Sequence, residues 1–152
     1  MKKNVIIIAT MLLVISCGKN KKPHAIWHIN NEKYTSYNVN ISSGKAITLM
    51  EGSDGTSHFN ISMNVGGGFP QSGEIEITLG IPLNSMQCNA GFFRDGTRYL
   101  IERHVHAKLK AYNNKGKSKL VLEPTPFINW IDTDSAIIQG TDSVIISGEF
   151  YE

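Results

Sequence analysis

The sequence predicts an all-β fold: an antiparallel β-sandwich, with a partly open β-barrel as the alternative, after an N-terminal signal segment. From position 24 onward, Val, Ile, Thr, Tyr and Phe recur in short runs. Clusters of Gly, Asn, Asp, Ser and Pro separate these runs, as turns separate strands. No segment after the signal keeps the 3.6-residue apolar period of a helix. Roughly eight to ten short strands with frequent turns are typical of a sandwich or barrel.

The strand-forming runs follow one another without a long linker. Asn30-Asn31 and Asp95-Gly96 each separate two runs, as the turn of a β-hairpin does. Pro124 and Pro126 are expected to break a strand, because proline cannot donate a ladder hydrogen bond. The expected strands lie at 25–29, from 34, 37–41, 46–50, 59–65, 74–79, 90–93, 97–112, 120–122, 137–138 and 144–150.

Two runs alternate strictly enough to predict which face is buried. In 59–65 every odd position is apolar and every even position is polar, so Ile61, Met63 and Val65 should face the core. In 97–112 we expect one long strand with two faces. Ile101, Val105, Ala107, Leu109 and Ala111 share the apolar face, and Glu102, His104, His106, Lys108 and Lys110 share the polar face.

The first sixteen residues have the features of a lipoprotein signal peptide. Lys2 and Lys3 form a basic start, and the apolar stretch 5–15 has the length of a signal h-region rather than of a transmembrane helix. It ends in Val14-Ile15-Ser16-Cys17, which resembles the lipobox of bacterial lipoproteins. We expect cleavage after residue 16 and acylation of Cys17, with 17–23 as a polar tether and 24–152 as a single β domain. The alternative is an uncleaved anchor that ends in an unrelated cysteine.

Charge and cysteine content restrict the function classes. Loss of Lys2 and Lys3 with the signal lowers the basic residues from 15 to 13, against 13 acidic ones. The mature chain is therefore neutral, and overall charge gives no reason to expect a nucleic-acid partner. Acylation of Cys17 leaves Cys88 without an intramolecular partner, so we expect a buried, inert thiol and a domain without a disulfide.

Both ends of the domain resemble a known kind of envelope protein. The opening AIWHINNEKYTS joins an apolar strand, an Asn-Asn turn and an aromatic residue, and the closing DSVIISGEFYE ends in an I-S-G-x-F strand. With the lipobox and the short tether, this pattern is similar to that of small envelope lipoproteins of Bacteroidota. The resemblance implies a β-sandwich-like domain on the cell envelope and supplies no catalytic residues.

Glu102, His104 and His106 are the candidates for a metal site. On one face of a strand, a carboxylate and two imidazoles would project together, and these are donors that zinc accepts. No further ligand can be nominated, and Lys108 and Lys110 continue the same face, where their charges oppose a cation. We therefore expect neither a metal nor any other cofactor.

A basic face is the candidate binding surface. Between positions 98 and 119 seven cations accompany Glu102 as the one acid, while the chain after 119 carries acids only. Two readings stay open: the charges offset each other across the sheet, or the basic residues meet an acidic protein or an anionic glycan. The seven cations are Arg98, Arg103, Lys108, Lys110, Lys115, Lys117 and Lys119.

Short sequence motifs indicate whether the chain is modified and whether it is an enzyme. Asp134-Ser135 and Asp142-Ser143 each begin a loose O-glycosylation sequon of the kind used in Bacteroidota envelope proteins. No nucleophile elbow, metalloprotease helix or Cys–His dyad is present, so we expect a protein that is not an enzyme.

The functional expectation is a membrane-anchored lipoprotein that acts as a non-enzymatic binding or scaffolding module. Acylated Cys17 would hold it in membrane lipid, with a protein or glycan as its second partner. The expected location is the cell envelope, in the periplasm or on the surface, with the outer membrane favoured. The alternative is a lipid-anchored inhibitor or immunity-type protein that acts on a hydrolase.

Overall fold

The computed structural model describes residues 24–66, 68–115, 117–133 and 136–152, and every regular element in them is a β-strand. This confirms the predicted all-β, sandwich-type fold. None of the described residues belongs to a helix long and apolar enough to cross a membrane. The strands are β1 Ala25–Ile29, β2 Glu32–Ser36, β3 Val39–Ser43, β4 Thr48–Ser53, β5 Ser57–Met63, β6 Gly73–Ile77, β7 Gln87–Arg94, β8 Thr97–Ile101, β9 Ala107–Asn114, β10 Lys117–Asp132 and β11 Ile137–Tyr151.

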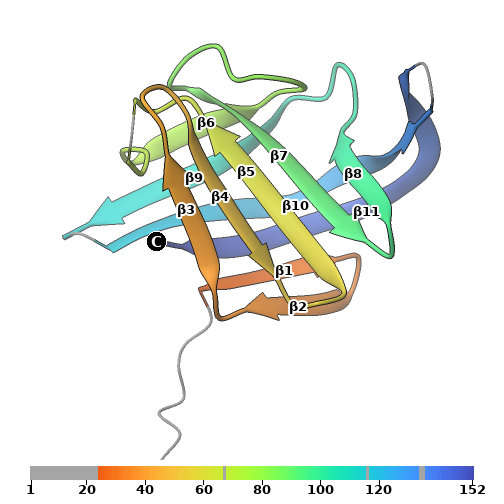
Figure 1. Ribbon diagram of the computed structural model, residues 1–152, viewed down its shortest axis with the longest axis horizontal. Helices are drawn as coiled ribbons and strands as arrows, with labels where there is room; N and C mark the ends of the chain where they lie inside the picture. Colours follow the sequence, from red (N-terminus) through yellow and green to blue (C-terminus); the bar gives the residue numbers. More distant parts are fainter. Residues whose placement is uncertain (1–23, 67, 116, 134–135) are drawn as a thin grey trace, which may run out of the picture.

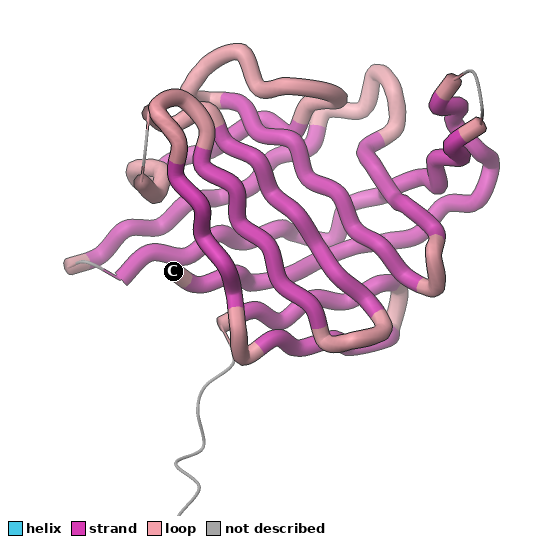
Figure 2. The backbone as a smooth tube through the Cα atoms, in the orientation of Figure 1, coloured by secondary structure: helices cyan, strands magenta, loops and turns pink. Residues whose placement is uncertain are grey.

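One continuous sheet folds over on itself to form two layers (Figure 1). The front layer contains β3, β4, β5 and β7, and the rear layer contains β2, β1, β11, β10 and β9. Strand β6 joins the layers between β7 and β9, and β8 joins them between β7 and β10. All pairings are antiparallel except the short one between β6 and β7. Figure 2 follows the backbone through the strands and their connecting loops.

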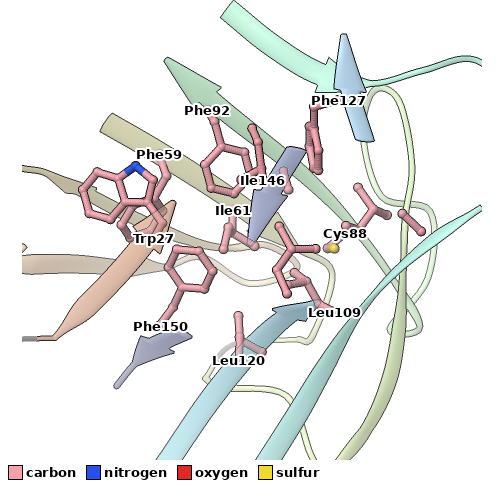
Figure 3. Close-up of a cluster of buried hydrophobic side chains, with 14 of the residues drawn as sticks. Trp27, Phe59, Ile61, Cys88, Phe92, Leu109, Leu120, Phe127, Ile146 and Phe150 are labelled. Atoms are coloured by element: carbon pink, nitrogen blue, oxygen red, sulfur yellow. The ribbon is translucent and has the colours of Figure 1, made fainter. Parts of the chain in front are cut away.

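The core lies between the two layers (Figure 3). Trp27, Phe150 and Leu120 enter it from the rear layer, and Phe59 and Phe92 enter it from the front layer. Their burial follows from strand alternation, which places every second side chain on the inner face. The predicted burial of Ile61 and Met63 in β5 is confirmed, whereas Val65 lies beyond the end of β5 and is half-buried.

Both predicted hairpins are present. Asn30 has φ 55° between β1 and β2, and Asp95 and Gly96 have φ 50° and 77° between β7 and β8. Asn, Asp and Gly tolerate this left-handed region better than other residues do. The turn residues therefore fix the register of the strands on either side.

The expectation of one strand over 97–112 is wrong. Strand β8 ends at Ile101 and β9 begins at Ala107, with a loop between them in which His104 has φ 69°. Both strands pair with β10, β8 along Phe127–Trp130 and β9 along Lys117–Leu122. Residues 102–106 form the loop that connects these two paired segments. Alternation alone cannot reveal it, because Val105 keeps the apolar phase through the loop.

Pro124 and Pro126 were also expected to break a strand, and they do not. Strand β10 runs through both, with a shift in its register against β11 between Leu122 and Thr125. On its other edge, β10 changes partner from β9 to β8 after Leu122. A missing N–H is tolerated at such a bulge and unpaired edge.

Candidate functional site

The sites predicted at the N-terminus and in one acidic loop lie outside the described residues. These are the lipidation site Cys17, the tether 17–23 and the Asp134-Ser135 sequon. The second sequon is described: Ser143 lies in β11 with its side chain exposed. Its glycosylation stays a prediction.

Glu102, His104 and His106 do not share a strand face, because all three lie in the loop between β8 and β9. Their side chains have different neighbours. Gln139 Nε2 lies 3.5 Å from Glu102 Oε1, while His106 Nδ1 lies 3.3 Å from Glu76 Oε1. Among the described residues, no three His, Cys, Asp or Glu side chains are placed to hold one metal ion.

Zinc titration is therefore expected to give no stoichiometric binding in the micromolar range. The reason is geometric, since a tetrahedral zinc site needs its donors directed at one point. Isothermal calorimetry on the full chain measures it, with His28→Ala as a control for non-specific histidine binding. Micromolar binding that is lost in His104→Ala and His106→Ala, and kept in His28→Ala, would contradict this expectation.

Three lysines of the basic face are neutralised by neighbouring strands. Lys108 Nζ lies 2.6 Å from Glu74 of β6, and Lys110 Nζ lies 3.1 Å from Glu123 of β10. Lys119 Nζ lies 3.1 Å from Glu149 of β11. The first two ion pairs are exposed and the third is partly buried. A hydrogen bond to Lys108 and the charge of that lysine lower the pKa of Glu74, and a hydrogen bond to Glu123 and its charge raise the pKa of Lys110. For these three lysines, the geometry supports the interpretation in which opposite charges offset each other across the sheet.

The other four cations lie at two ends of the molecule. Lys115 and Lys117 are exposed beside the turn between β9 and β10. Arg98 on β8 and Arg103 in the next loop line an open groove on the outer face of the front layer. The seven residues therefore do not form one continuous basic face.

Cys88 is a free and fully buried thiol, as predicted. Burial away from water raises its pKa to about 12. Burial and the raised pKa both disfavour the reactive thiolate of Cys88 in the folded protein.

Iodoacetamide is accordingly expected to leave Cys88 unmodified in the folded chain for hours at pH 8. In guanidinium the same cysteine should react within minutes, because unfolding restores an ordinary thiol pKa. Mass spectrometry of the peptide that contains Cys88 measures both rates. Equal labelling of the folded and unfolded chain would disprove the assignment of an inert thiol.

The groove on the outer face has a volume of about 600 Å³. Its floor includes Ser62 of β5 and Asn89 of β7, the outward positions next to buried core residues. One wall contains Leu79, Leu100 and Trp130, which belong to a small second apolar cluster together with Ile128. The groove thus lies where β5, β7, β8 and the C-terminal part of β10 meet.

Its rims are exposed aliphatic side chains. Ile81, in the loop between β6 and β7, is 75% exposed, and Ile137, at the start of β11, is 50% exposed. Both line the groove, and Leu83 in the same loop as Ile81 is 82% exposed. Large apolar side chains gathered at an edge of a groove are typical of interaction surfaces.

Arg98 and Arg103 are the charged groups of the groove, and Ser62 and Asn89 are its neutral polar side chains. Arg98 Nε and Trp130 Nε1 are buried and have no hydrogen-bond partner among the described residues. The Arg103 guanidinium lies over the Trp130 ring at 5.7 Å from its centroid. None of the described residues that line the groove is acidic. The arrangement favours an anionic, partly apolar ligand.

Sequence reasoning identified Arg98 and Arg103 but missed the groove. Arg98 and Trp130 are distant in the sequence, and only the pairing of β8 with β10 places them opposite each other. One signal was available: Gly80-Ile81-Pro82-Leu83 puts two aliphatic residues in a turn-forming segment, where their burial is not expected.

Comparison with known proteins gave no match to a family model, a curated protein or a solved structure.

Proposed function

We propose that this chain is a lipid-anchored protein of the bacterial cell envelope whose β domain binds another protein and performs no catalysis. Support for the anchor comes from the basic start, the short apolar stretch and the lipobox that ends at Cys17. The similarity of both ends of the domain to small envelope lipoproteins of Bacteroidota supports the same location. The outer membrane is the proposed site.

The observation that carries the binding function is the exposed apolar end of the domain, namely Ile81, Leu83 and Ile137 around the groove. In Figure 1 the loop after β6 and the start of β11 lie at the upper end, and β1, which follows His24, lies at the lower end. Exposed aliphatic side chains cost free energy in water, so a protein that keeps several of them together is expected to cover them with a partner.

The proposed anchor places this end away from the membrane. Segment 17–23 spans at most about 25 Å when fully extended. The lower end of the domain would therefore stay close to the lipid, and the groove would face the periplasm or the outside. A partner in either space can reach it.

Affinity purification from the native membrane fraction tests the proposal. The full-length chain should recover a protein partner, and Ile81→Asp combined with Ile137→Asp should lose it. The matched control is Ile145→Asp, which changes an equally exposed isoleucine of β11 on the outer face of the rear layer. A partner that all three forms recover equally would contradict a role for the apolar end.

An inhibitor of a hydrolase is the second candidate. The loop between β6 and β7 favours it, because Leu83 projects into solvent as a residue that fills an enzyme cleft does. Recovery of a hydrolase in the same purification, with its activity blocked by the full-length chain, would support inhibition. Recovery of envelope assembly components would support scaffolding.

A further inference from the structure

The chemistry of the groove indicates what kind of segment it binds. We infer that the groove holds a short stretch of a partner protein in which a carboxylate lies next to apolar side chains. The carboxylate pairs with Arg98 and Arg103, and the apolar side chains cover Ile81 and Ile137. This inference rests on the proposed binding function and adds the chemistry of the partner.

Arg98 and Arg103 form the polar centre of the site. Arg98 lies directly opposite Trp130 in the pairing of β8 with β10, and the Arg103 guanidinium lies 5.7 Å from the centroid of the Trp130 ring, so both arginines border this side chain. Arg98 Nε and Trp130 Nε1 are themselves buried, so a ligand in the groove meets the exposed parts of the two arginine side chains. A carboxylate offers two oxygens that can accept charge-assisted hydrogen bonds from such donors.

Aromatic and cationic side chains extend this centre across the front layer. Phe93 of β7 is paired with Arg98, whose guanidinium lies 5.8 Å from the centroid of the Phe93 ring. His58 of β5 is paired with Phe93, and their rings stack at 4.1 Å. At the other end, Arg103 covers Trp130. Of these residues, Arg98, Arg103 and Trp130 line the groove.

The width of the groove sets the size of the bound segment, because its lining residues Ser62, Asn89, Arg98 and Trp130 come from four neighbouring strands. The groove crosses β5, β7, β8 and β10, three strand spacings of about 4.8 Å each, or roughly 14 Å. An extended chain covers that distance with about four residues. The segment is therefore short, and the groove and its rims contact a few side chains on either side of the acid.

A protein segment fits these features better than a glycan or a free fatty acid does. An anionic glycan would leave Ile81 and Ile137 in contact with hydroxyl groups, which gains nothing from their apolar surface. A fatty acid would leave much of its chain in water, because the groove is open to solvent rather than enclosed. A protein segment satisfies the donors and also covers both rims.

Peptide display against the full-length chain in lipid nanodiscs tests the inference. The probe is a random twelve-residue library, and the best peptides are resynthesised with each Asp or Glu changed to Asn or Gln. We expect the selected peptides to carry an acid within two residues of Leu, Ile, Phe or Trp. The amide versions should bind at least about 10-fold more weakly, because a charge-assisted hydrogen-bond pair is lost.

Variants of the protein locate the contact. Arg98→Gln and Arg103→Gln should each weaken the acidic peptides about 10-fold or more, since each removes a charge-assisted hydrogen bond to the carboxylate. Lys33→Gln, which removes an exposed charge of β2 outside the groove, should bind as the unchanged chain does. Unchanged affinity in both groove variants would overturn the inference.

Other outcomes overturn it in distinguishable ways. If the selected peptides lack acids, or if oleate or an oligosaccharide of hexuronic acids occupies the groove while no peptide does, the proposed segment is wrong. Should affinity purification still depend on Ile81 and Ile137 in that case, the binding function stands and only the chemistry of the partner fails. Failure of both experiments rejects the binding function itself.

Discussion

Replacing Trp27 with alanine is expected to lower the free energy of unfolding by about 3–5 kcal/mol, the usual cost of deleting a large buried aromatic side chain. Trp27 is fully buried and contacts the rings of Tyr34 and Phe59 at centroid distances of 5.8 and 5.2 Å. Its Nε1 donates to Ser57 Oγ at 3.0 Å, and that hydroxyl donates to the Phe93 carbonyl at 2.8 Å. The side chain thus connects the rear layer to two strands of the front layer.

Chemical denaturation measures this loss as a lower midpoint at an unchanged slope. Ser57→Ala is the matched comparison, because it keeps the indole and removes only its acceptor. It should cost about 1–3 kcal/mol, the penalty for a buried donor left without a partner. A Trp27→Ala chain that unfolds at the same denaturant concentration as the unchanged protein would show that the two layers do not depend on this contact.

Replacing Cys17 with serine is expected to abolish lipid attachment completely and to leave the precursor uncleaved. The proposed modification forms a thioether on the cysteine sulfur, and a serine hydroxyl is too weak a nucleophile to replace the thiolate. Metabolic labelling with palmitate measures the attachment, and the mass of the chain shows whether residues 1–16 have been removed. Cys88→Ser should label as the unchanged chain does, because that thiol is buried.

Palmitate that persists in Cys17→Ser would reject the lipobox, and the N-terminal segment would then have to act as an uncleaved anchor. The β domain and its groove do not depend on this outcome. The orientation of the groove away from the membrane does depend on it, because the short segment 17–23 was used to place the domain.

The parts of the fold that sequence predicted are those fixed by neighbouring residues. Asn30-Asn31 and Asp95-Gly96 define hairpins because those residue types accept positive φ, and the alternation in β5 defines its buried face. The loop around His104 and the passage of β10 through Pro124 could not be predicted in the same way. Both depend on where β10 exchanges β9 for β8, which is a property of distant pairing.

The candidate site, like the fold, has features that the sequence predicts and features that depend on the pairing of distant strands. The sequence shows the positive charges of Arg98 and Arg103, and it shows the lysines and the acids. It does not show which acid forms an ion pair with which lysine. Lys108 forms an ion pair with Glu74 only because β6 pairs with β9. Two further strands, β7 and β8, lie between them in the sequence, so pairing of consecutive strands would not predict this contact. The sequence around Trp130 does not indicate that it lies beside Arg98, because only the pairing of β8 with β10 makes the two residues neighbours.

Photocrosslinking in living cells tests the central claim most directly. The full-length chain carries p-benzoylphenylalanine at position 137, on the rim of the groove, or at position 145, exposed on the outer face of the rear layer. The proposed function predicts a discrete crosslinked product with one envelope protein from position 137, weakened by Arg98→Gln, and none from position 145. Equal products from both positions, or a product from position 145 alone, would contradict binding at the groove.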